Sequence, residues 1–241
     1  MLYKTRGIVL HTINYSETSI IAKVYTELFG LQSYLINGVR NKKAKVKANL
    51  LQPLSLLDMV VYHKERTGLQ RISEIQPNIA FTSIPYNVVK SSIALFLNEI
   101  LYKAIREEEV NSNLFEFIYN STCILDLKAN NFHNFHLFFM MQLSKYLGFY
   151  PLGVYSESES YFNLKEGAFQ SSQPLHQHYL NYPLSQIAYQ ITISSYETLD
   201  TIILDKLQRK ELLQKIIDYF ELHLTSFSQV KSHHVLEEVM D

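Results

Sequence analysis

The spacing of apolar residues changes character near residue 80. Before that point, short apolar segments are separated by turn signals, which is a pattern typical of β-strands. The expected strands are Tyr3 to His11, Ile20 to Thr26, Gln32 to Val39, Leu54 to His63 and Leu69 to Ile75. Five strands in about 80 residues predict an OB-fold, a barrel that commonly binds oligonucleotides. An SH3-like barrel would leave a similar pattern, and periodicity alone does not decide between the two.

From residue 85 the apolar spacing becomes helical. The expected helices are 85–108 with Pro85 in the first turn, a second that begins with Ser112 as its cap, 132–147 ending at Gly148, Leu184 to Tyr189, and Leu207 to Leu224. Residues 149–183 lose the period and collect Gly, Pro, Ser, Tyr and Glu, which predicts a loop or an irregular insertion. We therefore predict an α+β protein. We expect an OB-fold barrel over residues 1–80 that binds nucleic acid, and an all-α domain over residues 81–241 that binds partners.

Charge divides the chain at the same place. The whole sequence has 22 Lys and Arg against 23 Asp and Glu. Residues 1–80 hold 11 basic against 5 acidic residues, a net charge of +6, whereas residues 81–241 hold 11 against 18, a net charge of −7. A basic half favours an anionic ligand, and an acidic half is better suited to protein partners.

The remaining composition predicts a cytoplasmic protein. Cys123 is the only cysteine, so an intrachain disulfide and a cysteine-based zinc site are both excluded. The first ten residues alternate charged and apolar side chains, and we expect no signal peptide there. The most apolar stretch, Phe132 to Leu147, is interrupted by polar residues, so we expect no membrane span.

Five basic residues lie within eight positions between two of the expected strands: Arg40, Lys42, Lys43, Lys45 and Lys47. An isolated basic run is commonly a solvated loop. In an OB-fold, however, loops between strands flank the ligand face. Further charge in this half comes from Arg6, Lys64, Arg66 and Arg71, and stacking surfaces from Tyr3, Tyr25, Tyr34 and Tyr62, which are also normal packing residues. We predict DNA contacts by the basic run, with Arg6 and Arg71 as further candidates.

Catalytic and metal-binding patterns are weak. The histidine pairs His133/His136, His176/His178 and His233/His234 supply two ligands each, and none belongs to a metalloprotease motif, so we expect no metal. Glu107, Glu108 and Glu109 are typical of a solvated helix end. No nucleophile-elbow, P-loop or dinucleotide-binding motif is present. We predict that the protein is not an enzyme and needs no cofactor.

A series of short motifs resembles the RecO family of bacterial recombination mediators. In chain order they are Gly7-Ile8-Val9-Leu10, Tyr15-Ser16-Glu17-Thr18, Tyr25-Thr26 with Gly30, Gly38-Val39-Arg40, Leu51-Gln52-Pro53-Leu54, Asn98-Glu99-Ile100-Leu101, Glu107 to Glu109, Leu114-Phe115, Leu147-Gly148 and Lys231-Ser232. Each motif is short, but their order and spacing extend over nearly the whole chain.

The resemblance implies an N-terminal OB-fold, a helical domain and a role in DNA repair. Members bind single- and double-stranded DNA, anneal complementary strands, and work with RecR so that RecA replaces single-stranded DNA-binding protein. RecA is thus an indirect partner, and the cell's nucleoid is the expected place of action. The helical domain is implied to contact the acidic, apolar C-terminal tail of single-stranded DNA-binding protein. Its first three helices and their connections offer the basic residues Lys103, Arg106, Lys128 and Lys145.

The chain departs from many family members at about residues 150–180, where they carry a cysteine zinc finger. This chain has no cysteine there, and we predict a metal-free variant in which packing replaces the zinc. Two other functions remain open. An OB-fold RNA-binding module would prefer RNA to single-stranded DNA, and a structural adaptor would show no salt-dependent nucleic-acid binding.

Overall fold

The structure is a computed structural model of the chain that describes residues 1–39, 46–64, 67–106, 109–225, 227 and 229–240. The chain divides into two compact units, Met1–Leu127 and Lys128–Asp241. The first contains the barrel and two long helices, whereas the sequence places its functional boundary at residue 80, where the period changes. That assignment of functions to 1–80 and 81–241 stays a prediction.

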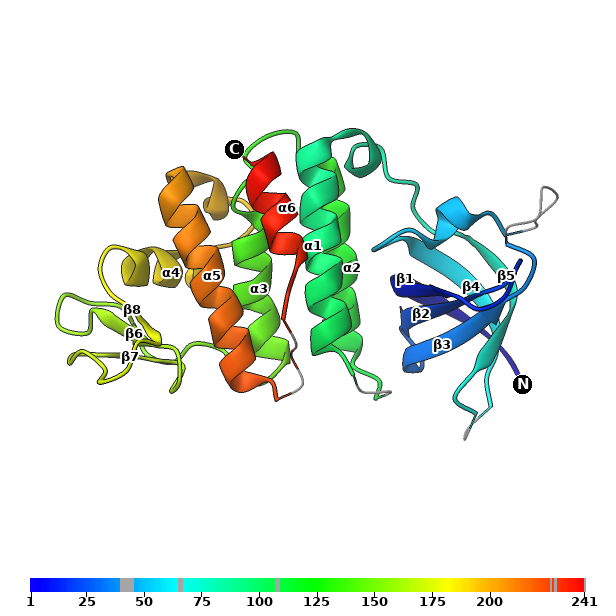
Figure 1. The fold of residues 1–241 in the computed structure, drawn as a ribbon, viewed down its shortest axis with the longest axis horizontal. Coiled ribbons are helices and arrows are strands. Elements are labelled where there is room, and N and C mark those ends of the chain that lie inside the picture. The colour runs from blue at the N-terminus through cyan, green and yellow to red at the C-terminus, as the bar shows by residue number, and fades with distance from the viewer. Residues whose placement is uncertain (40–45, 65–66, 107–108, 226, 228, 241) are drawn as a thin grey trace. The chain divides into compact units, whose positions relative to one another are not determined.

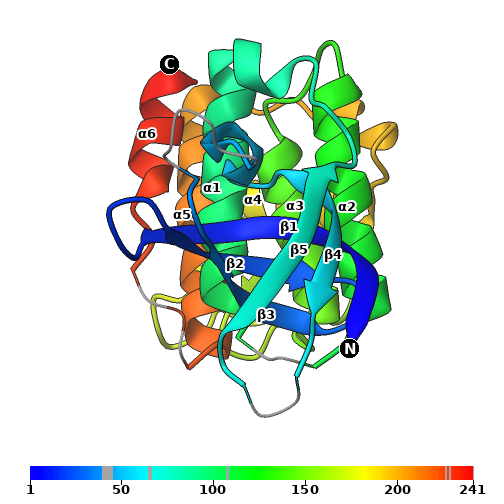
Figure 2. The same cartoon turned by 90° about the vertical axis from the view of Figure 1, so that its right-hand side faces the viewer.

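The first unit begins with a five-stranded closed barrel (Figures 1 and 2). Its strands are β1 (Leu2–Asn14), β2 (Ile20–Thr26), β3 (Gly30–Ile36), β4 (Leu56–Tyr62) and β5 (Gln70–Pro77). Their order is β1-β2-β3-β5-β4, and β4 closes on β1 through seven antiparallel residue pairs. The predicted five-stranded OB-fold barrel is confirmed.

Alternation of side chains builds the barrel core, as the sequence pattern predicts. The core includes Val9, Val24, Tyr34 and Met59, all fully buried. A residue with a side chain would clash at position 7, because a Cβ added to Gly7 would lie 2.7 Å from Val24 Cγ1 and 2.9 Å from Met59 Cε. A short 3-10 helix, η1 (Ala48–Leu51), connects β3 to β4.

Two long helices in the first unit pack on the outer face of β1 and β2. They are α1 (Val88–Ala104) and α2 (Ser112–Leu127), and the short 3-10 helix η2 (Ile84–Tyr86) precedes α1. Asn98 Nδ2 of α1 donates to Leu10 O of β1 at 2.7 Å, and Tyr25 Oη of β2 donates to Asn111 O at 3.3 Å. Consequently, this side of the barrel is covered, and its remaining outer face lies on β3, β4 and β5.

The helix starts differ slightly from the predicted ones. Pro85 lies in η2, and Asn87 caps α1 by accepting from Lys90 N at 3.1 Å. Asn111 has the corresponding role for α2, because its Oδ1 accepts from Leu114 N at 2.9 Å, whereas Ser112 is already helical. The chemistry expected at each start is present, one or two residues from the expected position.

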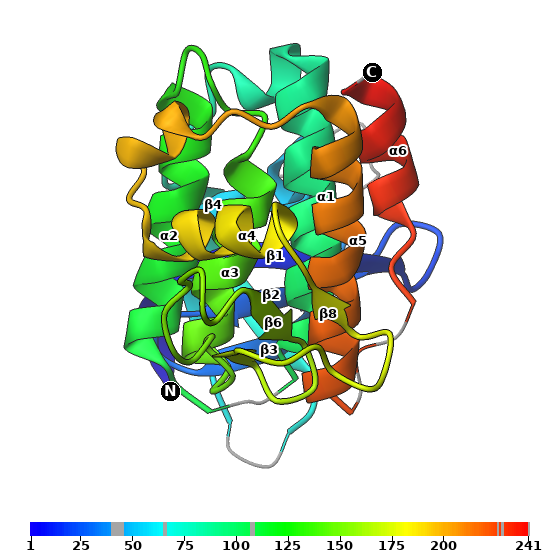
Figure 3. The same ribbon diagram turned by 90° about the vertical axis from the view of Figure 1, so that its left-hand side faces the viewer.

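The second unit is mostly helical and is shown from another side in Figure 3. Its helices are α3 (Phe135–Tyr146), α4 (Leu184–Ile193), the 3-10 helix η3 (Thr198–Thr201), α5 (Lys206–His223) and α6 (Ser232–Val239). α3 ends before Gly148, which has a φ of +87°. α5 begins with a capping box between Asp205 and Gln208. The sequence predicts α3, α4 and α5 but not the eight-residue α6.

The expected irregular insertion contains a small sheet. Its strands are β6 (Tyr161–Asn163), β7 (Ala168–Gln170) and β8 (Tyr179–Leu180), in the order β7-β6-β8. Phe162 of β6 packs on Tyr219 of α5 with ring centroids 5.5 Å apart, and Phe169 of β7 packs on Phe162 at 4.8 Å. Apolar packing thus holds this segment together.

Candidate nucleic-acid interface

Two described residues at the basic run pack on the barrel core. Arg40, Lys42, Lys43 and Lys45 fall outside the described residues, whereas Lys47 is described and exposed. Val39, just before the run, is buried in the barrel core, and Val46, next to Lys47, packs against the same core. Of the predicted phosphate contacts in the run, Lys47 is thus the one that the structure describes, and it is exposed beside a residue held by the barrel.

A row of paired residues crosses the uncovered outer face of the barrel. Leu35 of β3 pairs with Arg71 of β5, and Arg71 pairs with Tyr62 of β4. Their chain neighbours Tyr34, Gln70 and Val61 are buried, so the three side chains of the row point outward. Arg71 is exposed, and Tyr62 is 46% exposed. A cation and an accessible aromatic ring lie side by side on this face.

The β4–β5 loop next to this row is held at its base by Gln70. Gln70 Nε2 donates to Lys64 O at 2.9 Å and to Thr67 O at 2.7 Å, and its Oε1 accepts from Lys64 N at 3.1 Å. Lys64 is exposed, and Arg66 falls outside the described residues. In OB-folds this loop flanks the oligonucleotide site, so Lys64 belongs to the same candidate interface as Arg71 and Tyr62.

Arg6 is engaged within the protein. Its Nε and Nη2 donate to the two carboxylate oxygens of Glu27, both at 2.9 Å, and Nη2 also contacts Glu116 of α2. The guanidinium lies over the rings of Phe115 at 5.1 Å and Tyr119 at 4.9 Å. The hydrogen bond to Arg6 lowers the pKa of Glu27. Arg6 joins β1 to α2, and its charge faces two carboxylates.

Of the four candidate tyrosines, two are inside the protein. Tyr25 and Tyr34 are buried, and burial raises the pKa of Tyr25 to about 12. Tyr3 packs edge-on against Phe29 at 5.2 Å. Tyr62 therefore offers the most accessible ring of the four for base stacking.

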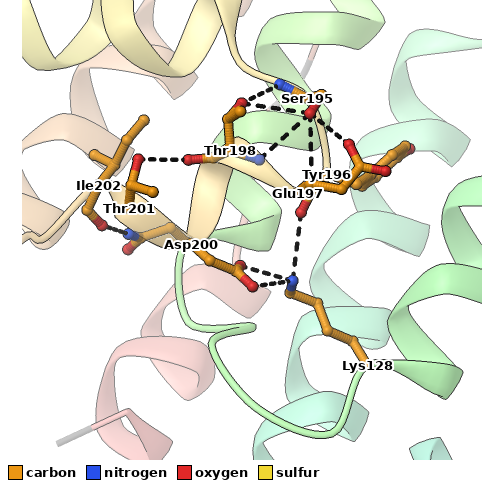
Figure 4. Close-up of polar contacts among 9 residues, drawn as sticks. Lys128, Ser195, Tyr196, Glu197, Thr198, Asp200, Thr201 and Ile202 are labelled. Atoms are coloured by element: carbon orange, nitrogen blue, oxygen red, sulfur yellow. Dashed lines mark hydrogen bonds and ion pairs between the residues drawn. The ribbon is translucent and has the colours of Figure 1, made fainter.

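The basic residues predicted for a partner surface are largely occupied. Lys103 pairs with Glu99 at 3.5 Å, and Arg106 donates to Lys103 O at 3.4 Å. Lys128 Nζ lies 2.6 Å from Asp200 and donates to Tyr196 O at 3.4 Å, which holds the turn after α4 (Figure 4). Lys145 is exposed. Lys128 is thus a structural residue of the second unit.

A hollow with charged and apolar walls, which the sequence analysis missed, lies between α5 and α6, which run alongside each other in Figures 1 and 3. Its volume is about 400 Å³, and its lining includes apolar residues such as Leu207, the acidic residues Glu237 and Glu238, and three basic residues, Lys206, Arg209 and Lys210. Lys210 pairs with Glu237 at 2.9 Å, whereas Arg209 donates to two uncharged acceptors, Asn134 Oδ1 at 3.1 Å and Leu204 O at 2.9 Å. The available signal was the presence of these three basic residues within five positions at the start of the helix predicted from Leu207.

The histidines do not gather into a metal site. Across the parts of the chain with described coordinates, no group of three or more His, Cys, Asp or Glu could hold a metal ion. His136 is fully buried, and burial lowers its pKa to about 3. His178 N donates to His176 Nδ1 at 3.2 Å, a local turn contact. In the described helices, none is both long and apolar enough to span a membrane.

Comparison with known proteins covers nearly the whole chain. The family model for the recombination protein O N terminal matches residues 1–80, and that for the recombination protein O C terminal matches residues 85–233. The chain is 42% identical over 242 residues to the DNA repair protein RecO of Bacteroides fragilis, with 100% of both chains covered. It is 36% identical to that of Azobacteroides pseudotrichonymphae over 100% of both, and 34% identical to that of Flavobacterium psychrophilum over 99% of both. With its five-stranded barrel, its following helices and these matches, the chain belongs to the RecO family.

Proposed function

We propose that this chain binds single- and double-stranded DNA through the uncovered side of its barrel. The protein would then anneal complementary strands. Together with RecR, it would load RecA onto DNA coated by single-stranded DNA-binding protein. Family membership supports the repair role. The observation that carries the DNA-binding part is the row of Arg71 and Tyr62 on the outer face of the barrel.

This surface suits DNA of any sequence. Lysine and arginine neutralise phosphates, and an exposed ring stacks on a base of any kind. Annealing follows physically, because neutralising the phosphates of two strands lowers their mutual repulsion. The protein thus acts through binding, and no covalent bond has to be broken or formed.

The basic run sets the expected salt dependence. If Arg40, Lys42, Lys43, Lys45 and Lys47 each contact a phosphate of a single strand, the logarithm of the binding constant falls against the logarithm of salt concentration with a slope of about −3.5. Replacing Lys42, Lys43, Lys45 and Lys47 with glutamate removes most of the affinity for single-stranded DNA, as measured by fluorescence anisotropy. Unchanged affinity would exclude the run as the phosphate site.

A matched pair of double variants separates the site from the net charge. Lys45→Glu with Lys47→Glu changes the net charge as much as Lys145→Glu with Lys165→Glu, and both residues of the control pair are exposed. Only the first pair weakens binding strongly if the basic run is the site. Equal losses would mean that net charge alone governs affinity.

The mediator role is tested by annealing complementary strands coated with single-stranded DNA-binding protein, with and without RecR. A mediator accelerates annealing of coated strands. An RNA-binding module would prefer RNA and fail in this assay, and a structural adaptor would show no salt-dependent binding to either nucleic acid.

For the acidic tail of single-stranded DNA-binding protein we propose the hollow between α5 and α6. The second unit contains eight Lys and Arg against 12 Asp and Glu, so a local basic group is needed to hold an acidic tail. Three of those eight basic residues, Lys206, Arg209 and Lys210, line this one hollow beside the exposed Leu207. Charge for the carboxylates and an apolar surface for the tail's apolar end lie together there.

A further inference from the structure

An apolar groove lies in the first unit, between the β3–β4 connection, the segment after β5 and helix α1. Its volume is about 620 Å³, within the range of about 300–1,000 Å³ usual for ligand pockets. Its walls include Leu50, Pro53, Phe81 and Leu95. None of the side chains that line it carries a formal charge, although this is the basic end of the chain.

The Leu51-Gln52-Pro53-Leu54 motif forms one wall of this groove. Leu51 and Leu54 are buried in the barrel, whereas Gln52 and Pro53 are exposed. Leu54 has a φ of +60°, a left-handed conformation that costs a residue with a side chain about 1–2 kcal/mol. Leu54 N donates to Val9 O at 2.9 Å, and Val9 N donates to Ser55 O at 3.1 Å. The barrel thus holds this turn in one shape, with Gln52 and Pro53 presented at the groove.

The groove is suited to a neutral, flat ligand with polar edges. Apolar walls favour a flat apolar face, and the exposed amides of Asn49 and Gln52 offer hydrogen-bond donors and acceptors to its edge. An acidic peptide would need a cation in the lining, and the lining has none. Nucleobases have this combination of faces and edges.

A positive charge for the phosphate of a nucleotide is available close to the groove in the sequence. Lys47 is exposed and lies two residues before Asn49, at the end of the basic run. We propose that the groove receives unpaired bases of the single strand whose phosphates contact Lys47. This inference rests on the DNA binding proposed above and adds a base-binding subsite to it. Because duplex bases are stacked and paired, the subsite favours single strands over duplex.

Two strands of equal length and charge test the proposal: thirty thymidines, and thirty abasic sites on the same sugar-phosphate backbone. One base that stacks on a protein surface contributes about 1–3 kcal/mol, so the wild-type protein binds the thymidine strand about 5- to 150-fold more tightly than the abasic strand. The slope of affinity against salt stays the same for both strands, because the phosphate contacts are the same.

The groove variant is Leu95→Glu, and its matched control is Leu28→Glu. The two leucines are 44% and 45% exposed, and Leu28 lies outside the groove lining in the turn between β2 and β3. A new carboxylate repels both strands equally, so a change in the ratio of the two affinities reports on base contacts. We expect the ratio to fall in Leu95→Glu, to the part that stacking on the exposed Tyr62 contributes, and to keep its wild-type value in Leu28→Glu. Thermal melting of each variant verifies that it is folded.

Each outcome decides a different question. If the wild-type protein binds neither strand, the proposed DNA binding is wrong. If it binds both strands equally and with a normal salt slope, DNA binding stands and the base subsite is wrong. The subsite is also wrong if Leu95→Glu keeps the wild-type ratio, and loss of RecR binding in that variant would instead identify the groove as a protein contact.

Discussion

Arg6 and Arg71 carry the same charge on the same barrel, but their surroundings differ. Arg6 is held by Glu27 and Glu116 and lies over two aromatic rings, whereas Arg71 is exposed beside Tyr62. A guanidinium already paired with two carboxylates gains little from a phosphate. An exposed one can exchange water for a phosphate at small cost.

The two arginines should therefore respond differently to replacement. Arg6→Gln lowers the free energy of unfolding by about 1–2 kcal/mol, because an ion pair and a cation–π contact are lost, and changes DNA affinity less than twofold. Arg71→Gln changes stability by less than about 0.5 kcal/mol and reduces the salt slope for single strands by about 0.7. Urea unfolding and anisotropy titrations measure the two effects. The reverse result would place Arg6 in the DNA site.

Sequence reasoning could select these residues but not separate them. The count of basic residues in 1–80 treats Arg6 and Arg71 alike, since the partners of Arg6 are 21 and 110 positions away. Likewise, the sequence does not distinguish between Tyr25, Tyr34 and Tyr62. They differ in whether the side chain is buried or exposed in the barrel. The row that pairs Tyr62 with Arg71 depends on strand register, which the pattern did not fix.

At the scale of elements, Asp126 at the end of α2 ties the segment before α1 in place. Its carboxylate accepts from the backbone nitrogens of Thr82, Ser83 and Ile84, each at 2.8 Å. Lys90 of α1 donates to Asp126 O at 2.9 Å. Burial alone would raise the pKa of Asp126, but the hydrogen bonds from the backbone amides and the Thr82 hydroxyl lower this pKa by more, so the net change is downward.

Asp126→Asn should cost about 2 kcal/mol at neutral pH, because buried amide N–H groups lose a charged acceptor. The folded pKa lies below the ordinary value of 3.8, so the carboxylate stabilises the fold above that value, and its contribution is lost as the pH falls through the folded pKa. The difference in unfolding free energy between wild type and variant is thus constant near neutrality and shrinks below about pH 3.8.

Urea unfolding at several pH values measures this difference. The control is Asp58→Asn, since Asp58 is partly exposed and accepts from Asn78 Nδ2 at 2.9 Å. Its effect should stay below about 1 kcal/mol. A difference for Asp126→Asn that does not change with pH would show that folding does not lower the pKa of Asp126.

Element prediction succeeded where the period is long and failed where elements are short. The five barrel strands and α1, α2, α3 and α5 each repeat their pattern enough times to be recognised. β6, β7 and β8 contain two or three residues each, too few to show alternation, and their stability comes from aromatic contacts with α5. α6 has eight residues and no strong cap, so its position depends on packing.

At the scale of the whole molecule, the signs of charge are separated along the chain. The first unit has 14 Lys and Arg against 11 Asp and Glu, and the second has 8 against 12. One protein can therefore attract DNA at one unit and avoid it at the other. A mediator that must bind both a strand and the protein that coats it needs this separation.

The hollow between α5 and α6 is the place to test the second role. Arg209→Gln should weaken binding of the C-terminal peptide of single-stranded DNA-binding protein by about 10- to 100-fold, because hydrogen bonds to charged groups contribute about 1.5–3 kcal/mol. Leu207→Ser should weaken it through lost apolar contact, whereas Leu152→Ser, at a residue that is also exposed but lies outside the hollow, should not. Isothermal titration calorimetry measures all three.

The DNA binding proposed for the barrel gives the control for that experiment. All three variants should keep wild-type affinity for single-stranded DNA, since the changes lie in the second unit. Equal peptide affinity in Arg209→Gln and wild type would exclude the hollow as the tail site.

The barrel closes unevenly, and this has a mechanical consequence. β3 and β5 are joined by two parallel residue pairs, Tyr34 with Gln70 and Leu35 with Arg71, whereas β1 and β4 share seven antiparallel pairs. The amides of this narrow seam should exchange with deuterium sooner than those of β1, because few hydrogen bonds have to break for it to open. A DNA strand lying across Arg71 would clamp the seam shut, so that part of the binding energy becomes local stiffness of the barrel.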